Sequence, residues 1–218
     1  MSHIKAVIFD LDGTLLNTLD DLHASVSYAL AQLSLPPRGK DETRLAVGDG
    51  IANLIARSIE GGKENPQFGD ALFLFREHYS LHSTDHTAPY EGILPLLSIL
   101  RKSGIRIGVV SNKIHSAVRE LSARYFHGLI DYAVGEREGI RRKPCPDSLL
   151  ACIKRLSLSP EDCLYVGDSE QDILTAKNAG IPSLSVTWGY RDRDTLLTAG
   201  ATTLVDSPEE ILTHIAKK

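Results

Sequence analysis

Short apolar runs alternate with amphipathic stretches along most of the chain. The runs have the composition of strands that are buried on both faces, and they predict strands over residues 5–9, 106–110, 131–134, 163–166, 183–187 and 202–205. The patterns between the later runs predict helices over 113–124, 146–156, 170–179 and 193–198. Strands that alternate with helices indicate a doubly wound α/β fold, in which a parallel sheet is covered on both faces.

This alternation is interrupted once, between the first and second predicted strands. The intervening chain has only helical patterns, over 19–33, 41–46, 51–60 and 66–82, separated by LPPRG, VGDG and GGKENP. Because this is too much chain for one crossover helix, we expect an α/β core of residues 1–15 and 89–218 with an all-helical insertion over 16–88. The insertion follows the carboxyl end of the first strand, where open α/β sheets bind ligands, so we expect it to be a cap domain.

Composition narrows the class of protein. The 218 residues are 42% hydrophobic and 24% charged with a formal net charge of -4, which is typical of a globular protein and unlike a nucleic-acid-binding surface. The three cysteines are an odd number without a CxxC pair, which favours a reducing compartment. With no apolar leader and no run long enough for a membrane span, we expect a cytoplasmic monomer or homodimer with neither nucleic-acid nor membrane partners.

Two carboxylates end the first apolar run, in the stretch AVIFDLDGTLLNT. Asp10 and Asp12 lie one residue apart and are followed by Gly13 and Thr14. Like charges held this close repel each other unless a cation or a shared proton relieves them. The alternative is an Asp-Gly turn in which Asp12 only hydrogen-bonds its own backbone.

Polar groups follow the other predicted strand ends as well. In GVVSNK, Ser111 and Asn112 offer a hydroxyl, an amide and backbone N–H groups to phosphate oxygens, although the same pair can simply cap the next helix. Lys143 lies in RRKPCP between two prolines, which reduce the conformational freedom that the loop must lose if the lysine points inward. A lysine is otherwise usually a solvated surface residue.

A second pair of acids, Asp168 and Asp172, ends the run LYVGDSEQD. Asp168 would join Asp10 at the sheet edge, and Asp172, one turn into the next helix, would face the same cluster or stabilise the helix N-terminus. Asp10, Asp12 and Asp168 are hard oxygen ligands of the kind that Mg²⁺ prefers. The residues expected to bind and neutralise a phosphoryl group are Ser111, Asn112 and Lys143.

The motifs DLDGTLLNT, VVSNK, the lysine of RRKPCP and GDSEQD, in this order, resemble the four motifs of the haloacid dehalogenase superfamily. The resemblance implies a Rossmann-like core and makes Asp10 the nucleophile that forms an aspartyl-phosphate. It implies that Asp12 protonates the leaving group and then activates water, and that Mg²⁺ is held by the Asp10 side chain, the Asp12 backbone carbonyl and Asp168. It implies that Ser111 and Lys143 bind phosphate with Asn112 beside them, and that Asp172 supports the cluster from behind.

Asp12 also distinguishes this chain from the dehalogenases after which the superfamily is named, because they lack a carboxylate at this position. One departure from the pattern of this branch is Asn17-Thr18 in place of Asp-Ser. These positions lie at the expected cap hinge, so the change concerns cap closure and substrate fit rather than catalysis.

Four stretches, TLLNTLDDL, VGDGIANLI, KNAGI and VTWGY, are most similar to the phosphoglycolate phosphatase-like group. This likeness implies that Gly48, Asp49 and Gly50 form a cap loop that selects the substrate; the alternative is a plain helix–helix turn. We therefore expect a Mg²⁺-dependent phosphatase for a small phosphorylated metabolite such as 2-phosphoglycolate. The alternatives are a pyrophosphatase, a nucleotide or sugar-phosphate phosphatase, a β-phosphoglucomutase-like mutase and, from other classes, a phosphoacceptor signalling domain or a catalytically silent binding protein.

Overall fold

The computed structural model describes residues 4–215 of the chain. The chain divides into two compact units. Unit 1 combines Met1–Leu15 with Pro89–Lys218, and unit 2 is Leu16–Ala88. Each unit has its own hydrophobic core and is described by itself.

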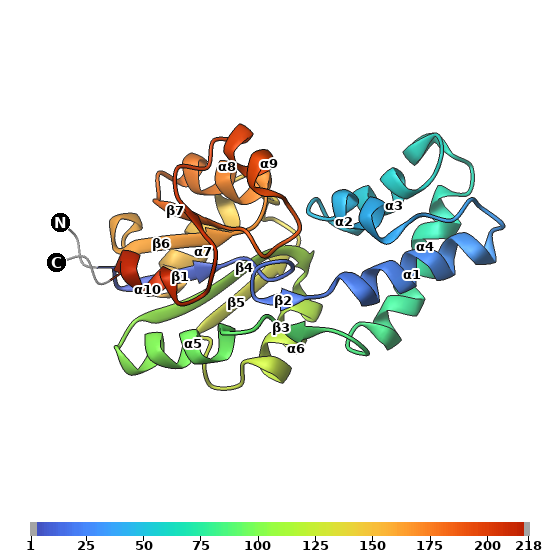
Figure 1. The fold of residues 1–218 in the computed structure, drawn as a ribbon. Coiled ribbons are helices and arrows are strands. Elements are labelled where there is room, and N and C mark those ends of the chain that lie inside the picture. Colours follow the sequence, from blue (N-terminus) through green and yellow to red (C-terminus); the bar gives the residue numbers. More distant parts are fainter. Residues whose placement is uncertain (1–3, 216–218) are drawn as a thin grey trace. The chain divides into compact units, whose positions relative to one another are not determined.

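Unit 1 is built around a six-stranded parallel sheet with the strand order β5-β4-β1-β6-β7-β8 (Figure 1). The strands are β1 (Ala6–Phe9), β4 (Arg106–Ile114), β5 (Tyr132–Glu136), β6 (Cys163–Gly167), β7 (Ser183–Val186) and β8 (Leu204–Val205). β1 is central and fully buried, because β4 and β6 flank it on its two edges. The predicted doubly wound parallel α/β fold is confirmed.

Helices cover both faces of this sheet. They are α5 (Ile93–Lys102), α6 (His115–Tyr125), α7 (Asp147–Arg155), α8 (Glu170–Ala179), α9 (Arg193–Thr198) and α10 (Glu210–Ile215), with a short 3₁₀ turn, η2 (Pro160–Asp162), before β6. Val134 of β5 belongs to the core cluster that β1 and β6 form with α7 and α8. The next residue, Gly135, faces the other way, so closely against Val118 of α6 that a Cβ there would lie 2.7 Å from its side chain. In Figure 1, α5 lies on the same side of the sheet as α6.

Three elements of unit 1 differ from the expectation: β4, α5 and α10, the last being a helix that was not predicted. β4 continues to Ile114, where it still pairs with Glu136 of β5 after a register shift, so α6 begins at His115 rather than at residue 113. α5 was not expected, because its apolar stretch contains Pro95. That proline is the third residue of the helix, where a backbone N–H has no helical partner to lose.

Unit 2 is a bundle of α1 (Leu19–Gln32), α2 (Lys40–Ala46), α3 (Ile51–Ser58), a 3₁₀ turn η1 (Gly62–Glu64) and α4 (Phe68–His82). Its core draws apolar side chains from all four α-helices, among them Val26, Ala46, Ile55 and Phe75. α1 and α4 pack along each other. Apolar side chains that recur at helical spacing therefore give this unit a core separate from that of the sheet.

The two segments that join the units pair with each other as a two-stranded sheet of β2 (Leu16–Asn17) and β3 (Ala88–Pro89). Next to them, Asp21 of α1 is buried and accepts three hydrogen bonds: from the backbone N–H of His86 (2.9 Å) and from the N–H and hydroxyl of Thr87 (2.9 and 2.7 Å). Asn17 accepts a hydrogen bond from the N–H of Leu19. The beginning and the end of unit 2 are thus tied together.

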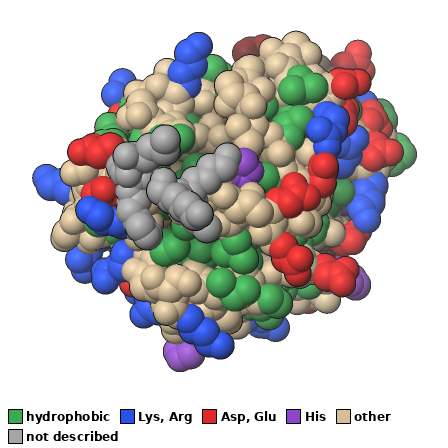
Figure 2. Space-filling model, turned by 60° about the vertical axis from the view of Figure 1, so that its left-hand side comes forward, with side chains coloured by type: hydrophobic (Ala, Val, Ile, Leu, Met, Phe, Trp, Pro, Cys, Tyr) green, Lys and Arg blue, Asp and Glu red, His purple; other side chains and the backbone are tan. Residues whose placement is uncertain are grey.

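On the face of the molecule shown in Figure 2, Lys and Arg side chains lie scattered among acidic and hydrophobic ones. Within residues 4–215, no helix combines the length and the apolar character that crossing a membrane requires. Cys145, Cys152 and Cys163 are all free thiols, and the last two are buried.

Candidate active site

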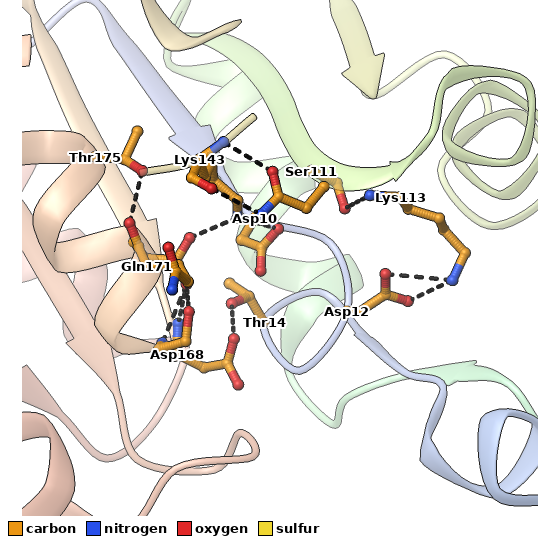
Figure 3. Close-up of polar contacts among 12 residues, drawn as sticks. Asp10, Asp12, Thr14, Ser111, Lys113, Lys143, Asp168, Gln171 and Thr175 are labelled. Carbon is orange, nitrogen blue, oxygen red and sulfur yellow. Dashed lines mark hydrogen bonds and ion pairs between the residues drawn. The ribbon is translucent and has the colours of Figure 1, made fainter. Parts of the chain in front are cut away.

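The carboxyl end of β1 leads directly into the loop that carries Asp10 and Asp12. The backbone N–H of Asp10 still bonds to the carbonyl of Val166 (2.9 Å), so the nucleophile candidate is held by the sheet. Gly13 then turns the chain with a φ of +88°, and a Cβ there would lie 2.3 Å from Oδ2 of Asp168. Only glycine fits this turn, which brings the loop against the end of β6 (Figure 3).

Asp10, Asp168 and Asp172 form a buried carboxylate cluster, with one oxygen of each lying within 4.8 Å of the others. Burial raises the pKa of Asp10 well above its usual range, and the charges of Asp172 and Asp168 raise it further while that of Lys143 opposes them. Burial, followed by the charge of Asp172, raises the pKa of Asp168 to about 7. The cluster therefore brings like charges together at an electrostatic cost.

Lys143 is the cation of this cluster and is only 5% exposed. Its Nζ lies 2.8 Å from Oδ1 of Asp10 and 2.6 Å from Oδ1 of Asp172. Burial alone would lower the pKa of the ammonium group, but the charges of Asp10 and Asp172 outweigh that effect and raise it. Lys143 therefore stays protonated and offsets one of the three negative charges.

Asp172 holds its neighbours in place with both carboxylate oxygens. Oδ2 accepts hydrogen bonds from the Ser169 hydroxyl (2.6 Å), the Ser169 N–H (3.1 Å) and the Asp168 N–H (3.2 Å). Oδ1 accepts from the hydroxyl of Tyr165 (2.9 Å) as well as from Lys143. Ser169 and Asp172 form the capping box of α8. Asp172 therefore stabilises the helix N-terminus and also faces the cluster, as both interpretations of this residue expected.

Asp168 is oriented by groups that the sequence did not single out. Its Oδ1 accepts from the hydroxyl of Thr14 (3.2 Å), and its Oδ2 accepts from the backbone N–H of Tyr190 (2.8 Å). Gly189 allows that approach, because a Cβ there would lie 2.3 Å from the Cβ of Asp168. The indole of Trp188 donates to the carbonyl of Thr14 (3.1 Å) and links the same two loops.

The end of β4 supplies the remaining polar groups. The side chain of Asn112 bonds the backbone of Lys143 twice, accepting from its N–H (2.8 Å) and donating to its carbonyl (3.2 Å). Ser111 accepts from the N–H of Lys113 (3.1 Å). Asn112 therefore holds the loop that carries Lys143.

Lys113 is the site residue that the sequence analysis missed, having placed it in a helix. It is buried, and its Nζ lies 3.0 and 3.3 Å from the two carboxylate oxygens of Asp12. Figure 3 shows this pair beside Ser111. Strand alternation was the available signal, since Ser111 and Lys113 lie two residues apart and share a face once β4 is continued to Ile114.

The carboxylate cluster has the chemistry of a divalent-cation site. When all three carboxylates are ionised they outnumber the one ammonium group, and hard oxygen ligands suit Mg²⁺. The side chain of Asp12 lies with Lys113 rather than in this group of three, which leaves its backbone carbonyl as the means by which it could contribute to a metal site. The cluster is therefore a candidate metal centre.

In unit 2, Gly48, Asp49 and Gly50 form the turn between α2 and α3, with φ values of +131° at Gly48 and +81° at Gly50. The guanidinium of Arg57 pairs with the Asp49 carboxylate and donates to the carbonyl of Ala46 (3.0 Å). The turn is thus fixed from within unit 2.

Comparison with known proteins places the chain among hydrolases. The family model for haloacid dehalogenase-like hydrolases matches residues 7–186. A phosphoglycolate phosphatase 1 of Pseudomonas aeruginosa is 34% identical over 95% of this chain and 78% of its own length. An N-acetylmuramic acid 6-phosphate phosphatase of the same species is 31% identical over 96% and 93%. A crystal structure assigned as a phosphoglycolate phosphatase from Lactobacillus delbrueckii superposes with a TM-score of 0.93, at 34% identity over 99% and 100% of the two chains.

These matches confirm the resemblance and the enzyme class that the motifs predict, a hydrolase of phosphoric monoesters. They agree with the parallel α/β sheet of unit 1. The chain belongs to the haloacid dehalogenase-like hydrolase family.

Proposed function

We propose that this protein is a Mg²⁺-dependent phosphatase that hydrolyses a small phosphomonoester through an aspartyl-phosphate on Asp10, with 2-phosphoglycolate as the preferred substrate. The observation that carries the proposal is the buried group of Asp10, Asp168, Asp172 and Lys143. A carboxylate that attacks an anionic phosphate needs positive charge beside it, and Lys143 supplies part of that charge 2.8 Å from Asp10.

The metal would be held by the side chains of Asp10 and Asp168 and by the backbone carbonyl of Asp12. When bound, Mg²⁺ offsets charge on the phosphoryl oxygens. Asp172 keeps its oxygens on Lys143, Tyr165 and Ser169, so its part is to position the lysine and the loop rather than to bind the metal.

The carboxylate of Asp10 attacks phosphorus, and the bond from phosphorus to the ester oxygen breaks. Asp12 gives its proton to that leaving oxygen and later takes a proton from the water that attacks the aspartyl-phosphate. The products are the alcohol, inorganic phosphate and the original Asp10 carboxylate. Lys113 contacts both oxygens of Asp12 and so fixes the carboxylate for these two transfers.

Ser111 and Lys143 would bind the phosphoryl oxygens. The Ser111 oxygen already accepts from the N–H of Lys113, and its O–H can still act as a donor. Asn112 acts on the phosphate indirectly, because its two bonds to the Lys143 backbone set the position of the ammonium group.

Unit 2 would serve as the cap, with Gly48, Asp49 and Gly50 as its specificity loop. Two glycines at positive φ let the backbone of this turn approach a ligand closely. Arg57 holds Asp49 in a single orientation, so the loop presents a defined surface to a substrate.

The test is phosphate release from 2-phosphoglycolate, N-acetylmuramic acid 6-phosphate, a nucleotide, a sugar phosphate and pyrophosphate, each with Mg²⁺ and with EDTA. We expect Mg²⁺-dependent release that is fastest with 2-phosphoglycolate. N-acetylmuramic acid 6-phosphate is included because one relative carries that activity in its name. A different preferred ester would retain the chemistry and overturn the substrate; no release from any compound would favour a mutase or a binding protein.

A further inference from the structure

A pocket of unit 1 lies between α6 and the edge strand β5, and none of the residues of the carboxylate cluster lines it. Its volume is about 460 Å³, within the range of small-molecule sites. α6 lines it with His115, Arg119 and Ser122, which share one face of the helix. Tyr132 of β5 and Arg137, just after that strand, line the opposite wall.

Basic groups dominate this pocket. Burial lowers the pKa of His115, and the charges of Arg137 and Arg119 lower it further. Within residues 4–215, neither arginine forms an ion pair with a carboxylate. The acid that lines the pocket, Asp131, is already paired with arginines 101 and 106 and accepts from the N–H of residue 107.

The pocket also contains an unsatisfied donor. Ser122 is 6% exposed, and its hydroxyl has no hydrogen-bond partner among the described residues. Ser25 and Ser58, two other buried helical serines, bond the carbonyl four residues earlier at 2.8 Å, whereas Ser148 of α7 has no partner within the described part of the chain either. A buried hydroxyl without a partner is costly, and a ligand in the pocket would supply one.

His115 offers a donor as well. Its Nδ1 accepts a hydrogen bond from the N–H of Gly135 (3.2 Å), so the proton of the neutral ring is on Nε2. The polar groups in question are two guanidinium groups, an imidazole N–H and a hydroxyl, all of which donate. Such a set suits a ligand rich in acceptors.

From this geometry we propose that the pocket binds a small organic anion whose phosphoryl or carboxylate group lies between His115, Arg119 and Arg137. Its oxygens accept from the Ser122 hydroxyl, and its apolar part lies along the lining residues Ala123, Ile130 and Ala133. The proposal is independent of the substrate and mechanism proposed for the carboxylate cluster.

The experiment is a titration of the ¹⁵N-labelled full chain, with Mg²⁺ present, monitored by NMR. The probes are inorganic phosphate, phenylphosphonate and benzoate, which a phosphatase does not hydrolyse. The amide of Gly135, bonded to His115, is the signal for this pocket, and the amide of Ser169, bonded to Asp172, is the signal for the active site. We expect phenylphosphonate or benzoate to move the Gly135 signal saturably.

In the double variant Arg119→Ala/Arg137→Ala the dissociation constant should rise about tenfold or more. Arg124→Ala is the matched control, since Arg124 is an exposed arginine of the same helix that does not line the pocket, and it should leave binding unchanged. A Gly135 signal that no probe moves at millimolar concentration overturns the proposal, as does a shift that survives in the double variant. Movement of the Ser169 signal alone would mean binding at the active site only and would also overturn it.

Ser122→Ala separates a ligand-binding hydroxyl from a structural one. We expect this variant to bind the probe more weakly and to unfold at the same temperature as the wild type or higher, because it removes an unsatisfied group. Ser58→Ala, which loses the bond to the Leu54 carbonyl, is the comparison and should unfold at a lower temperature. A Ser122→Ala protein that unfolds as early as Ser58→Ala, with unchanged binding, would contradict the role assigned to Ser122.

Discussion

Each unit of this protein buries a carboxylate, but the surroundings of the two differ. Asp21 in unit 2 accepts three hydrogen bonds from residues 86 and 87, all of them at 2.9 Å or less. Asp10 in unit 1 lies with two more carboxylates and one lysine. The first environment gives the carboxylate three hydrogen-bond donors, whereas the second gathers three carboxylates around one ammonium group. Burial alone therefore does not identify a catalytic acid; the neighbours do.

The largest expected effect is the loss of activity when the Asp10 carboxylate is made neutral. Asp10→Asn should lower kcat by about 10⁴-fold or more, because it removes the nucleophile. The folded protein should remain at least as stable, since one of three repelling charges is gone. Steady-state kinetics and urea unfolding test this, with the exposed Asp41→Asn as the control. Substantial remaining turnover would refute the assignment of Asp10.

Lys113→Met should have the next largest effect. Asp12 would lose the ammonium group that contacts both of its oxygens, so we expect kcat to fall about 10²- to 10³-fold with a smaller change in KM. Lys113→Arg should restore part of the rate, and Lys154→Met, at an exposed position, serves as the control. Equal loss in kcat for the methionine and arginine variants, or a change confined to KM, would contradict a positioning role for Lys113.

Asp21→Asn tests the structural role of the hydrogen-bonded carboxylate in unit 2. Placing an NH₂ group against the donors of Thr87 should reduce the free energy of unfolding by about 1.5–3 kcal/mol. The kcat of the folded molecules should keep its order of magnitude. Urea unfolding followed by tryptophan fluorescence measures the first quantity. A large loss of kcat at unchanged stability would mean that Asp21 serves the reaction.

The smallest expected effect is a change with pH in how much Mg²⁺ stabilises the protein. The pKa of Asp168 is raised from an ordinary value of 3.8 to about 7, so the metal-free folded state holds its proton more tightly than the unfolded state does. This contribution to stability is complete below about pH 4 and is lost as the pH rises to about 7. Mg²⁺ competes with that proton, so its stabilising effect should grow over the same range and level off above pH 7. Thermal unfolding with Mg²⁺ and with EDTA would show it; a difference that shrinks with rising pH contradicts the expectation.

The alternation of strands and helices along the chain, and the acids that follow strand ends, could be predicted from sequence because both depend on short-range pattern. Apolar runs and the residues that end them identify Asp10, Ser111 and Asp168 without knowledge of the fold. The sequence did not identify Lys113, because β4 continues past the predicted strand end through a register shift against β5. That shift depends on pairing with residues about twenty positions away. The N–H of Tyr190 that binds Asp168 carries no side-chain signal at all.

The pairing of β2 with β3 brings the two ends of unit 2 together at a single short ladder. A segment whose ends pair in this way can be replaced as a whole. The β2–β3 pairing that joins it to unit 1 stays the same whatever sequence lies between Asn17 and Ala88. Mutation and recombination can then vary one unit while the strand register behind Asp10 is inherited intact. If unit 2 selects the substrate, as proposed, substrate preference can then change while the residues of unit 1 stay the same.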